Sequence, residues 1–419
     1  DDSTMEFDFV IMCTGHTWPL KYEPTIPGYF DSPYPPEKIK IPIDFPVAIR
    51  GASLTAIDAV RTLARHNGTF SKDGQGMIHF MKAEARDNFK MVMHSRNGLL
   101  PAIRFHLEDS HLSKDSVLSK KEVDETRAVN EGFLPLDYVF EKNFKNPLKE
   151  NDPDFYAIIK NMKMEEFVAA VMNLREKIPP FELFKAEYEE AEKSIRRRES
   201  VYWKEMLAVL SFTMNYPAKY FSAEDMLRLQ KVLMPLISVV IAFVPQTSVE
   251  EMLALHRAGV LDLLAVGEES DVTPEPTGGA TYSFTDESNQ KISNHYHLFI
   301  DCIGQPHLSW DELPFKSMVA DKTVSAARLK FRDAGKGGEE MKKENSRVIK
   351  DSAGNYFLRV PGITINDSFQ VVDETGNANH RIFMMAVPYI GGFNPDYSGL
   401  DFCEAVSAKV YAKLKKSYK

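Results

Sequence analysis

Short, nearly continuous apolar runs that end at a glycine mark several predicted strands in this sequence. Phe7–Cys13 runs into Thr14-Gly15, and Phe299–Cys302 runs into Ile303-Gly304 in the same way. Such runs are typical of strands buried on both faces, as in a parallel sheet. Phe45–Arg50 is a further predicted strand, and helical periodicity follows it. The alternation of these elements predicts an α/β fold.

Helical periodicity dominates the middle of the chain. Met164–Lys177 and Phe181–Met214 carry it, and Ser222 and Ser248 each open a pattern typical of a helix N-terminus. The helix that starts at Ser248 is expected to end at Gly259, since glycine is favoured just beyond a helix C-terminus. We therefore predict a mostly helical segment from about residue 101 to residue 235.

Composition narrows the function classes. The chain has 419 residues, 43% hydrophobic and 26% charged, which is ordinary for soluble proteins of this size. Its formal net charge of −9 disfavours nucleic acid as a partner. The longest apolar run, Val232–Pro245, is too short to span a bilayer. Three distant cysteines define neither a disulfide framework nor a zinc site, which favours a cytoplasmic setting.

The turn that follows the predicted strand Phe45–Arg50 is the main candidate for chemistry. A dinucleotide-binding turn needs a glycine at the tight bend, then a small residue facing the pyrophosphate, then a small residue where the helix packs on the strand. Gly51, Ser53 and Ala56 meet these requirements, and Leu54 and Thr55 complete the start of the helix. A tight turn without a ligand, as in any α/β protein, is the alternative.

The end of the next predicted strand, Lys90–His94, suggests which coenzyme would bind. An arginine at this position suits a 2′-phosphate, whereas an acid suits a free ribose hydroxyl. Ser95 and Arg96 occupy it, so the sequence favours NADPH over NADH. A plain surface arginine is one alternative. The other is that an acid from the exposed segment between residues 67 and 87, such as Asp73 or Glu84, approaches the ribose.

The glycine-rich loop Pro388–Leu400 lies between a predicted strand and a predicted helix. Such loops collect ligands at the carboxyl edge of α/β sheets, although a structural loop is an equal alternative. The candidate cofactor-binding residues there are Gly391, Gly392, Asn394, Gly399 and Leu400. His16 and His307 each follow a glycine-ended strand and are candidates for lining a cofactor cleft. His295 and His297 have no third ligand nearby, so no metal site is predicted.

Taken in order, these segments resemble bacterial flavoproteins with two dinucleotide-binding domains, distant relatives of N-hydroxylating and Baeyer–Villiger monooxygenases. The family's first FAD segment closes with Ala-Thr-Gly-His, matched by Cys13-Thr14-Gly15-His16, and its NAD(P) domain opens with a turn matched by Gly51–Asp58. The family's second NAD(P) strand, closing strand and returning loop are matched by Ser95–Leu99, Phe299–Gly304 and Gly391–Leu400.

This resemblance implies a Rossmann-like NAD(P) domain inserted into a partial FAD domain. The implied boundaries are 1–45 for the end of the first FAD segment with a linker, 46–304 for the NAD(P) domain with its helical insertion, and 305–419 for the second FAD segment. It also implies FAD and NADP as cofactors, with hydride passing from NADPH to the flavin. The electrons then pass to oxygen or to a small-molecule substrate or electron acceptor.

One departure from the family concerns the start of the chain. The family begins with a Gly-x-Gly-x-x-Gly turn that holds FAD, and none precedes Asp1. We therefore expect this chain to be part of a longer protein. A non-catalytic nucleotide-binding or scaffold protein is the alternative function.

Overall fold

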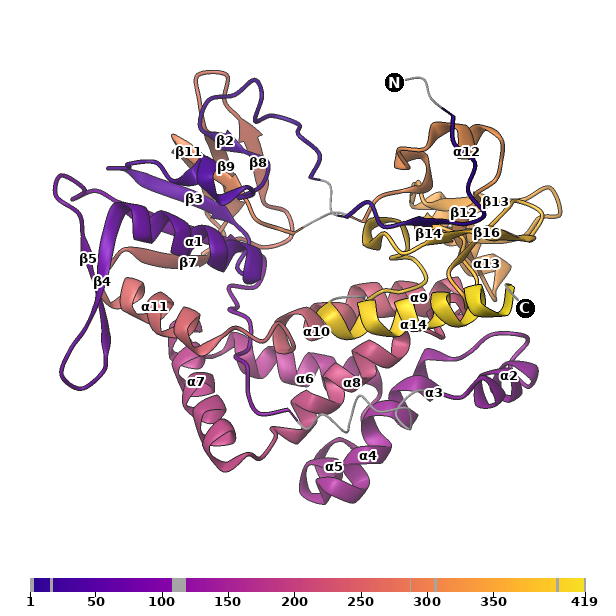
Figure 1. Cartoon of the computed structure of the whole chain (residues 1–419). Coiled ribbons are helices and arrows are strands. Elements are labelled where there is room, and N and C mark those ends of the chain that lie inside the picture. Colours follow the sequence, from indigo (N-terminus) through magenta and orange to yellow (C-terminus); the bar gives the residue numbers. More distant parts are fainter. Residues whose placement is uncertain are drawn as a thin grey trace.

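The computed structural model describes residues 4–15, 18–107, 118–286, 288–304, 307–396 and 399–417. The chain has a mixed α/β structure in which two β-rich lobes lie on a layer of helices (Figure 1). The first lobe holds the parallel sheet and the second holds both ends of the chain. β1 (Val10–Met12) belongs to the second lobe and β2 (Tyr29–Phe30) to the first (Figure 1).

The first lobe is built on a parallel sheet with the strand order β2-β11-β3-β6-β7. Its further strands are β3 (Pro46–Arg50), β6 (Lys90–Ser95), β7 (Leu261–Ala265) and β11 (Leu298–Asp301). Val47, Ala48 and Ile49 are fully buried in β3, as expected for a central strand covered on both faces.

Helices cover one face of this sheet and a small antiparallel sheet covers the other. The covering elements are η1 (Pro36–Ile39), α1 (Leu54–Asn67), α11 (Gln246–Arg257), β8 (Asp271–Pro274), β9 (Ala280–Thr285) and β10 (Lys291–Tyr296). In α1, Ile57, Val60 and Leu63 form one buried face, which is why this segment is helical and packs on the sheet. A hairpin of β4 (Gly68–Lys72) and β5 (Ile78–Lys82) separates α1 from β6.

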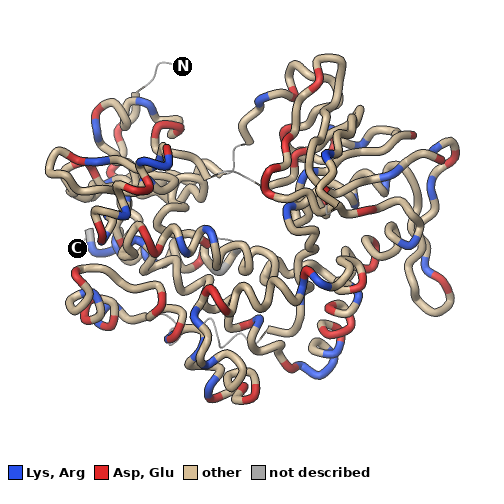
Figure 2. The backbone as a smooth tube through the Cα atoms, turned by 180° about the vertical axis from the view of Figure 1, so that it is seen from behind, with Lys and Arg blue, Asp and Glu red and all other residues tan. Residues whose placement is uncertain are grey.

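The helical layer runs from α2 to α10. Its elements are α2 (Lys120–Ala128), α3 (Leu136–Phe140), η4 (Glu141–Lys145), α4 (Asn146–Asn151), α5 (Pro153–Ile159), α6 (Met164–Glu176), α7 (Pro180–Arg197), α8 (Tyr202–Met214), η5 (Ala218–Tyr220), α9 (Ala223–Arg228), η6 (Leu229–Leu233) and α10 (Met234–Val240). Acidic and basic residues are interspersed over this layer (Figure 2), as on a solvated surface.

The second lobe combines a sheet of order β1-β16-β15 with a sheet of order β12-β14-β13. Its elements beyond β1 are η7 (Trp310–Glu312), α12 (Lys316–Ala320), β12 (Ala326–Lys330), α13 (Ala334–Lys342), β13 (Val348–Lys350), β14 (Tyr356–Ile363), β15 (Gln370–Val372), β16 (Ala378–Met384), η8 (Val387–Tyr389) and α14 (Gly399–Ser417). β1 pairs with β16 in parallel, from Val10 opposite Ile382 to Met12 opposite Met384.

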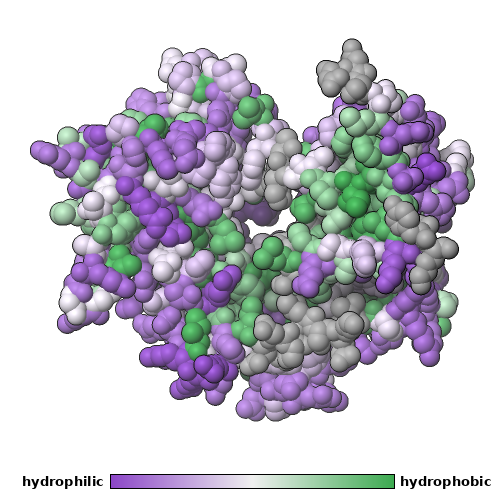
Figure 3. All heavy atoms as spheres, in the orientation of Figure 1, coloured by the Kyte–Doolittle hydropathy of each residue, from purple (hydrophilic) through white to green (hydrophobic). Residues whose placement is uncertain are grey.

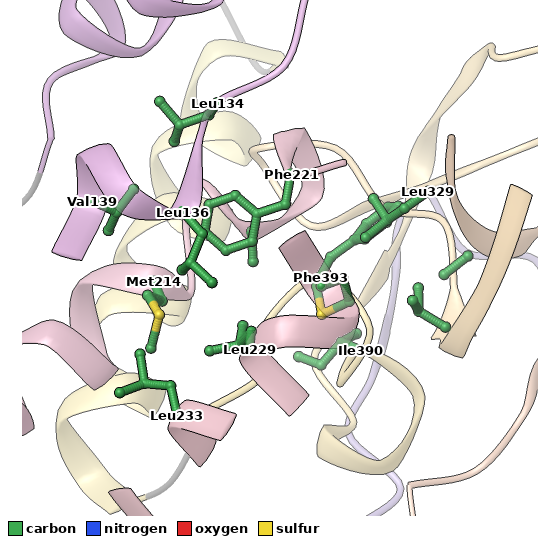
Figure 4. Packing of buried hydrophobic residues seen from close by; sticks show 14 of the residues in the cluster. Leu134, Leu136, Val139, Met214, Phe221, Leu229, Leu233, Leu329, Ile390 and Phe393 are labelled. Atoms are coloured by element: carbon green, nitrogen blue, oxygen red, sulfur yellow. The ribbon is translucent and has the colours of Figure 1, made fainter. Parts of the chain in front are cut away.

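The helical layer shares its largest hydrophobic core with the second lobe. Leu136, Met214 and Phe221 of the helices belong to one buried cluster with Leu329 and Ile390 of the second lobe (Figure 4). Helix α7 instead contributes Phe181 and Phe184 to the core of the first lobe. The layer is therefore fastened to both lobes by apolar packing.

Two helix boundaries differ from the expected ones. The stretch Phe181–Met214, which carries helical periodicity, is divided into two helices, because Arg198 takes a left-handed conformation (φ +56°) and ends α7. Helix α11 begins at Gln246 after Pro245, so the Ser248 cap prediction was wrong, since Ser248 lies inside the first turn. Its predicted end is confirmed, as Gly259 follows with a φ of +67° and donates its N–H to His256.

Candidate functional site

The best-formed candidate site lies at the carboxyl edge of the parallel sheet, between β3 and β11. From β3 the chain passes through α1 to β6 on one side, whereas β11 pairs with β3 on the other side. The direction of the connections therefore changes at β3. In open α/β sheets, ligands bind outside the carboxyl ends of the strands at such a change of direction. Gly51 follows β3 and Gly304 follows β11, so both lie at this edge.

The backbone at Gly51 requires glycine. Its φ is +113°, and a Cβ there would lie 2.8 Å from the carbonyl oxygen of Cys302. The Gly51 N–H donates to the carbonyl of His94 at 2.7 Å, and the Cys302 N–H donates to the carbonyl of Arg50 at 2.8 Å. The turn is thus held by backbone hydrogen bonds to strands on both sides of β3. The turn therefore leaves no room for a side chain at position 51 beside the backbone of Cys302.

The N-terminus of α1 lies directly after this turn and is suited to an anion. Ser53 is the N-cap residue, but its side chain makes no capping hydrogen bond, and the first turn contains no acidic residue. Ser53 and Leu54 are exposed, Thr55 is half-buried and Ala56 is buried against the sheet. The helix dipole and its unpaired N–H groups favour a negatively charged group at such an end.

Ser95 and Arg96 follow β6 at the same edge of the sheet. The Ser95 hydroxyl is buried without a hydrogen-bond partner among the described residues. Arg96 is exposed, and within the described chain its guanidinium forms no salt bridge. Its carbonyl accepts a hydrogen bond from the N–H of Gly267, so the segment after β7 lies beside it. Glu268, which follows Gly267, is an acid near the expected ribose position that sequence spacing missed.

The hairpin β4–β5 explains the long spacing between Gly51 and Arg96. It is inserted between the end of α1 and the start of β6, at the amino edge of the sheet. Asp73 lies in its turn, where the carboxylate accepts hydrogen bonds from the N–H groups of Gln75 and Met77 and pairs with His79. Asp73 and Glu84 therefore belong to the edge opposite Gly51.

His94 is the buried titratable group closest in sequence to this site. Its ring stacks on Tyr282 with centroids 4.2 Å apart and an interplanar angle of 12°. Burial lowers the pKa of His94 to about 4, so the ring is neutral at neutral pH. Arg50 at the end of β3 forms a salt bridge with Asp301 at the end of β11, at 3.2 Å. Burial nevertheless raises the pKa of the Asp301 carboxyl.

The candidate residues around β1 lie in the other lobe. Thr14 and Gly15 are exposed at the end of β1, and a Cβ on Gly15 would meet nothing within 4 Å. His16 lies outside the described residues. Gly304 likewise has open space around its Cα, but it belongs to the Gly51 edge. Thr14 and Gly15 are thus not brought together with the Gly51 turn.

The glycine-rich loop is mostly packed into the second lobe. Gly391, Gly392 and Asn394 are buried, and a Cβ on Gly392 would lie 2.4 Å from the carbonyl oxygen of Pro361. Asp396 receives hydrogen bonds from Ser211 and Asn215 of the helical layer. Gly399 and Leu400 begin α14, where Leu400 is exposed. The described part of this loop therefore serves packing between the second lobe and the helices.

Other chemistry is not apparent in the described parts of the chain. Among those residues, no group of three or more histidine, cysteine, aspartate or glutamate side chains could hold a metal ion. His295 instead contacts the carbonyl of Gly278 at 3.0 Å. No described helix has both the length and the apolar character needed to cross a membrane.

Comparison with known proteins finds a family match to part of the chain and a distant curated relative. Residues 119–241 match the YdhS-like middle domain family. The chain is 28% identical over 319 residues to the uncharacterized protein YdhS of Escherichia coli K12, which covers 74% of this chain. The match covers 57% of YdhS, so the chain spans little more than half the length of this curated relative.

Two solved structures show a weak overall likeness. Ornithine hydroxylase (PvdA) from Pseudomonas aeruginosa is 11% identical with a TM-score of 0.34, over 96% of this chain and 62% of that one. Its reduced form is 10% identical with a TM-score of 0.31, over 97% of this chain and 63% of that one. A likeness at this level carries no functional argument.

Proposed function

We propose that this chain binds NADPH at the Gly51 turn and acts as part of a flavin-dependent oxidoreductase. The observation that carries the proposal is the position of that turn. It combines a glycine in a conformation that needs glycine, an uncapped helix N-terminus and a change of connection direction in a parallel sheet. In α/β proteins these three features together favour a dinucleotide pyrophosphate.

The residues present fit a nicotinamide dinucleotide. The pyrophosphate would lie on the N–H groups at the start of α1, and the exposed Arg96 guanidinium would meet the 2′-phosphate. When bound, the nicotinamide would supply hydride to an acceptor. The chain's own contribution is to hold the coenzyme, and we assign no catalytic acid or base.

The flavin part of the proposal rests on the order of motifs given above. In the second lobe, the exposed strand end Thr14-Gly15 has open space, whereas Gly391, Gly392 and Asn394 are buried. The described residues therefore offer only part of a flavin site. This buried loop favours a second candidate, a nucleotide-binding protein without redox activity.

Coenzyme titration of two variants tests the nicotinamide site. Arg96→Ala should weaken NADPH binding by roughly ten- to a hundredfold and leave NADH binding nearly unchanged, because charge-assisted hydrogen bonds contribute about 1.5–3 kcal/mol. Arg86→Ala, at the opposite edge of the sheet, is the matched control. Equal affinities of the unaltered protein for NADPH and NADH would remove Arg96 from the site.

Ser53→Asp separates binding from folding. Aspartate is a good N-cap residue, so the variant should be at least as stable as the parent protein. Its carboxylate would occupy the place proposed for the pyrophosphate, and NADPH binding should be lost. Undiminished binding would contradict the site. Measuring NADPH oxidation with added FAD then distinguishes the oxidoreductase from the non-catalytic candidate.

A further inference from the structure

Three arginines lie in one row across the small sheet of the second lobe. Arg328 of β12 lies directly opposite Arg359 of β14. On the other side of β14, the N–H of Arg359 donates to the carbonyl of Arg347 at 2.7 Å, one residue before β13 begins. The flanking positions Leu329, Leu358 and Val348 are buried, so the arginines belong to the opposite, outward face of the sheet.

This row is unfavourable for the fold by itself. Like charges directly opposite each other in adjacent strands are destabilising. Within the described part of the chain, none of the three guanidiniums forms a salt bridge with a carboxylate. Arg328 rests on the ring of Phe357 at 4.8 Å, and Arg347 donates to the side-chain oxygen of Gln230 at 3.1 Å. These contacts orient two of the cations without neutralising them.

A cavity of about 290 Å³ opens beside the row, and this is an independent observation. Trp310 supplies an indole ring to its wall, and Arg347 and Arg359 line it together with Ser309 and Ser346. Ligand pockets of small molecules start at about 300 Å³, so this one is of a size for a base with its sugar and is too small for a dinucleotide. Aromatic walls with a few charged groups are typical of such pockets.

The acids in the cavity restrict what could bind. Asp311 and Glu312 also line it. Hydrogen bonding from Ser309 is the main cause that lowers the pKa of Asp311, so its carboxylate is ionised at neutral pH. Glu312 accepts hydrogen bonds from the Ser309 N–H and hydroxyl at 2.7 and 2.6 Å. An anion would be repelled by these two groups and attracted by the arginines. Hydroxyl or amino groups of a ligand would be attracted by the acids.

We propose that this cavity binds a nucleoside phosphate, with the phosphates on Arg347 and Arg359 of the row and the ring against Trp310. Guanidinium groups match phosphate oxygens in geometry and charge. A ribose hydroxyl would donate to the carboxylate of Asp311, which accounts for acids and arginines in one site. The site belongs to the second lobe and is independent of the nicotinamide site proposed at Gly51.

The test is calorimetric titration with ADP, inorganic pyrophosphate and adenosine. It uses Ser53→Asp protein, in which the proposed nicotinamide site is blocked. ADP should bind more tightly than either pyrophosphate or adenosine alone. Arg359→Gln should weaken ADP binding by at least about tenfold. Arg381→Gln removes an exposed arginine from β16 of the same lobe and is the matched control, with unchanged affinity expected.

Two further readings separate binding from folding and from a simple anion site. Arg359→Gln should not lower the thermal midpoint of the free protein, since it relieves repulsion in the row. The proposal is overturned if ADP binding is the same in Arg359→Gln and the parent, or if pyrophosphate binds as tightly as ADP. It is also overturned if ADP binds only when residue 53 is serine, because binding then belongs to the Gly51 turn.

Discussion

The two β-rich lobes contain strands with the same sequence signature in opposite surroundings. Phe299 and Ile300 of β11 are fully buried between β2 and β3. Val10 and Ile11 of β1 are 43% and 44% exposed, and among the described strands β1 pairs only with β16. Figure 3 shows apolar surface gathered over the second lobe. An apolar run therefore predicts a strand, whereas its burial depends on the neighbours that the fold supplies.

Truncating matched isoleucines in the two strands should give the largest difference between the lobes. Ile300→Ala should lower the free energy of unfolding by about 4 kcal/mol, because it leaves a cavity in a fully buried core. Ile11→Ala should cost about 1 kcal/mol, since nearly half of this residue's surface is already in water. Urea denaturation followed by circular dichroism measures both. Equal losses would mean that the outer surface of β1 is covered in solution.

Glycines that follow β3 in the first lobe and β1 in the second sharpen the same comparison. Gly51→Ala combines a positive φ with a Cβ 2.8 Å from the Cys302 carbonyl oxygen, and we expect it to cost about 3 kcal/mol. Gly15→Ala has a φ of +70° but open space around the Cβ, so about 1 kcal/mol is expected. The unfolding free energies of both variants provide the measurement. A similar small cost at both positions would show that the Gly51 turn relaxes easily.

The sequence predicted the elements of the first lobe well, since each depends on local pattern. Pro46–Arg50 is a strand, α1 follows Gly51 with the expected buried face, and Gly259 ends a helix. The break at Arg198 was not predictable, because arginine has no preference for the left-handed conformation that it adopts there. The predicted strand Phe299–Cys302 corresponds to β11, Leu298–Asp301.

The sequence predicted those candidate residues whose position follows from their spacing from a strand or a helix start. Gly51, Ser53 and Arg96 were selected from such spacing, and the structure places them at one edge of the sheet. Glu268 and the arginine row were missed because they depend on which strands become neighbours. The row consists of residues from three separate segments, Arg328, Arg347 and Arg359. Only the register in which β12, β14 and β13 pair brings them side by side.

Acid should weaken the first lobe through His94. Its pKa is about 4 in the folded state because the ring is buried, against an ordinary value near 6.5. Between these values the unfolded chain binds a proton that the folded chain does not. Stability is therefore complete above about pH 6.5 and falls as the pH is lowered toward 4, by about 3 kcal/mol in all. Above pH 6.5 this group contributes no pH dependence.

His94→Phe isolates this contribution, since a phenyl ring can still stack on Tyr282. Between about pH 7 and pH 5, the variant should lose roughly 1–2 kcal/mol less of its unfolding free energy than the parent protein. Equilibrium unfolding at the two pH values measures the difference. If parent and variant respond equally to acid, the His94 ring is protonated in the folded protein and its burial is less complete than the structure indicates.

The smallest expected effect has opposite signs in the two lobes. Arg50→Gln in the first lobe removes a cation paired with Asp301 and should lower the unfolding free energy by about 0.5 kcal/mol. Arg359→Gln in the second lobe removes the central cation of an unpaired row and should raise it by about 0.5 kcal/mol. Both effects should shrink in about 1 M salt, where charges are screened within about 3 Å. A loss of stability in Arg359→Gln at low salt would show that this guanidinium is held by a structural partner, and the second lobe would then balance its charges as the first one does.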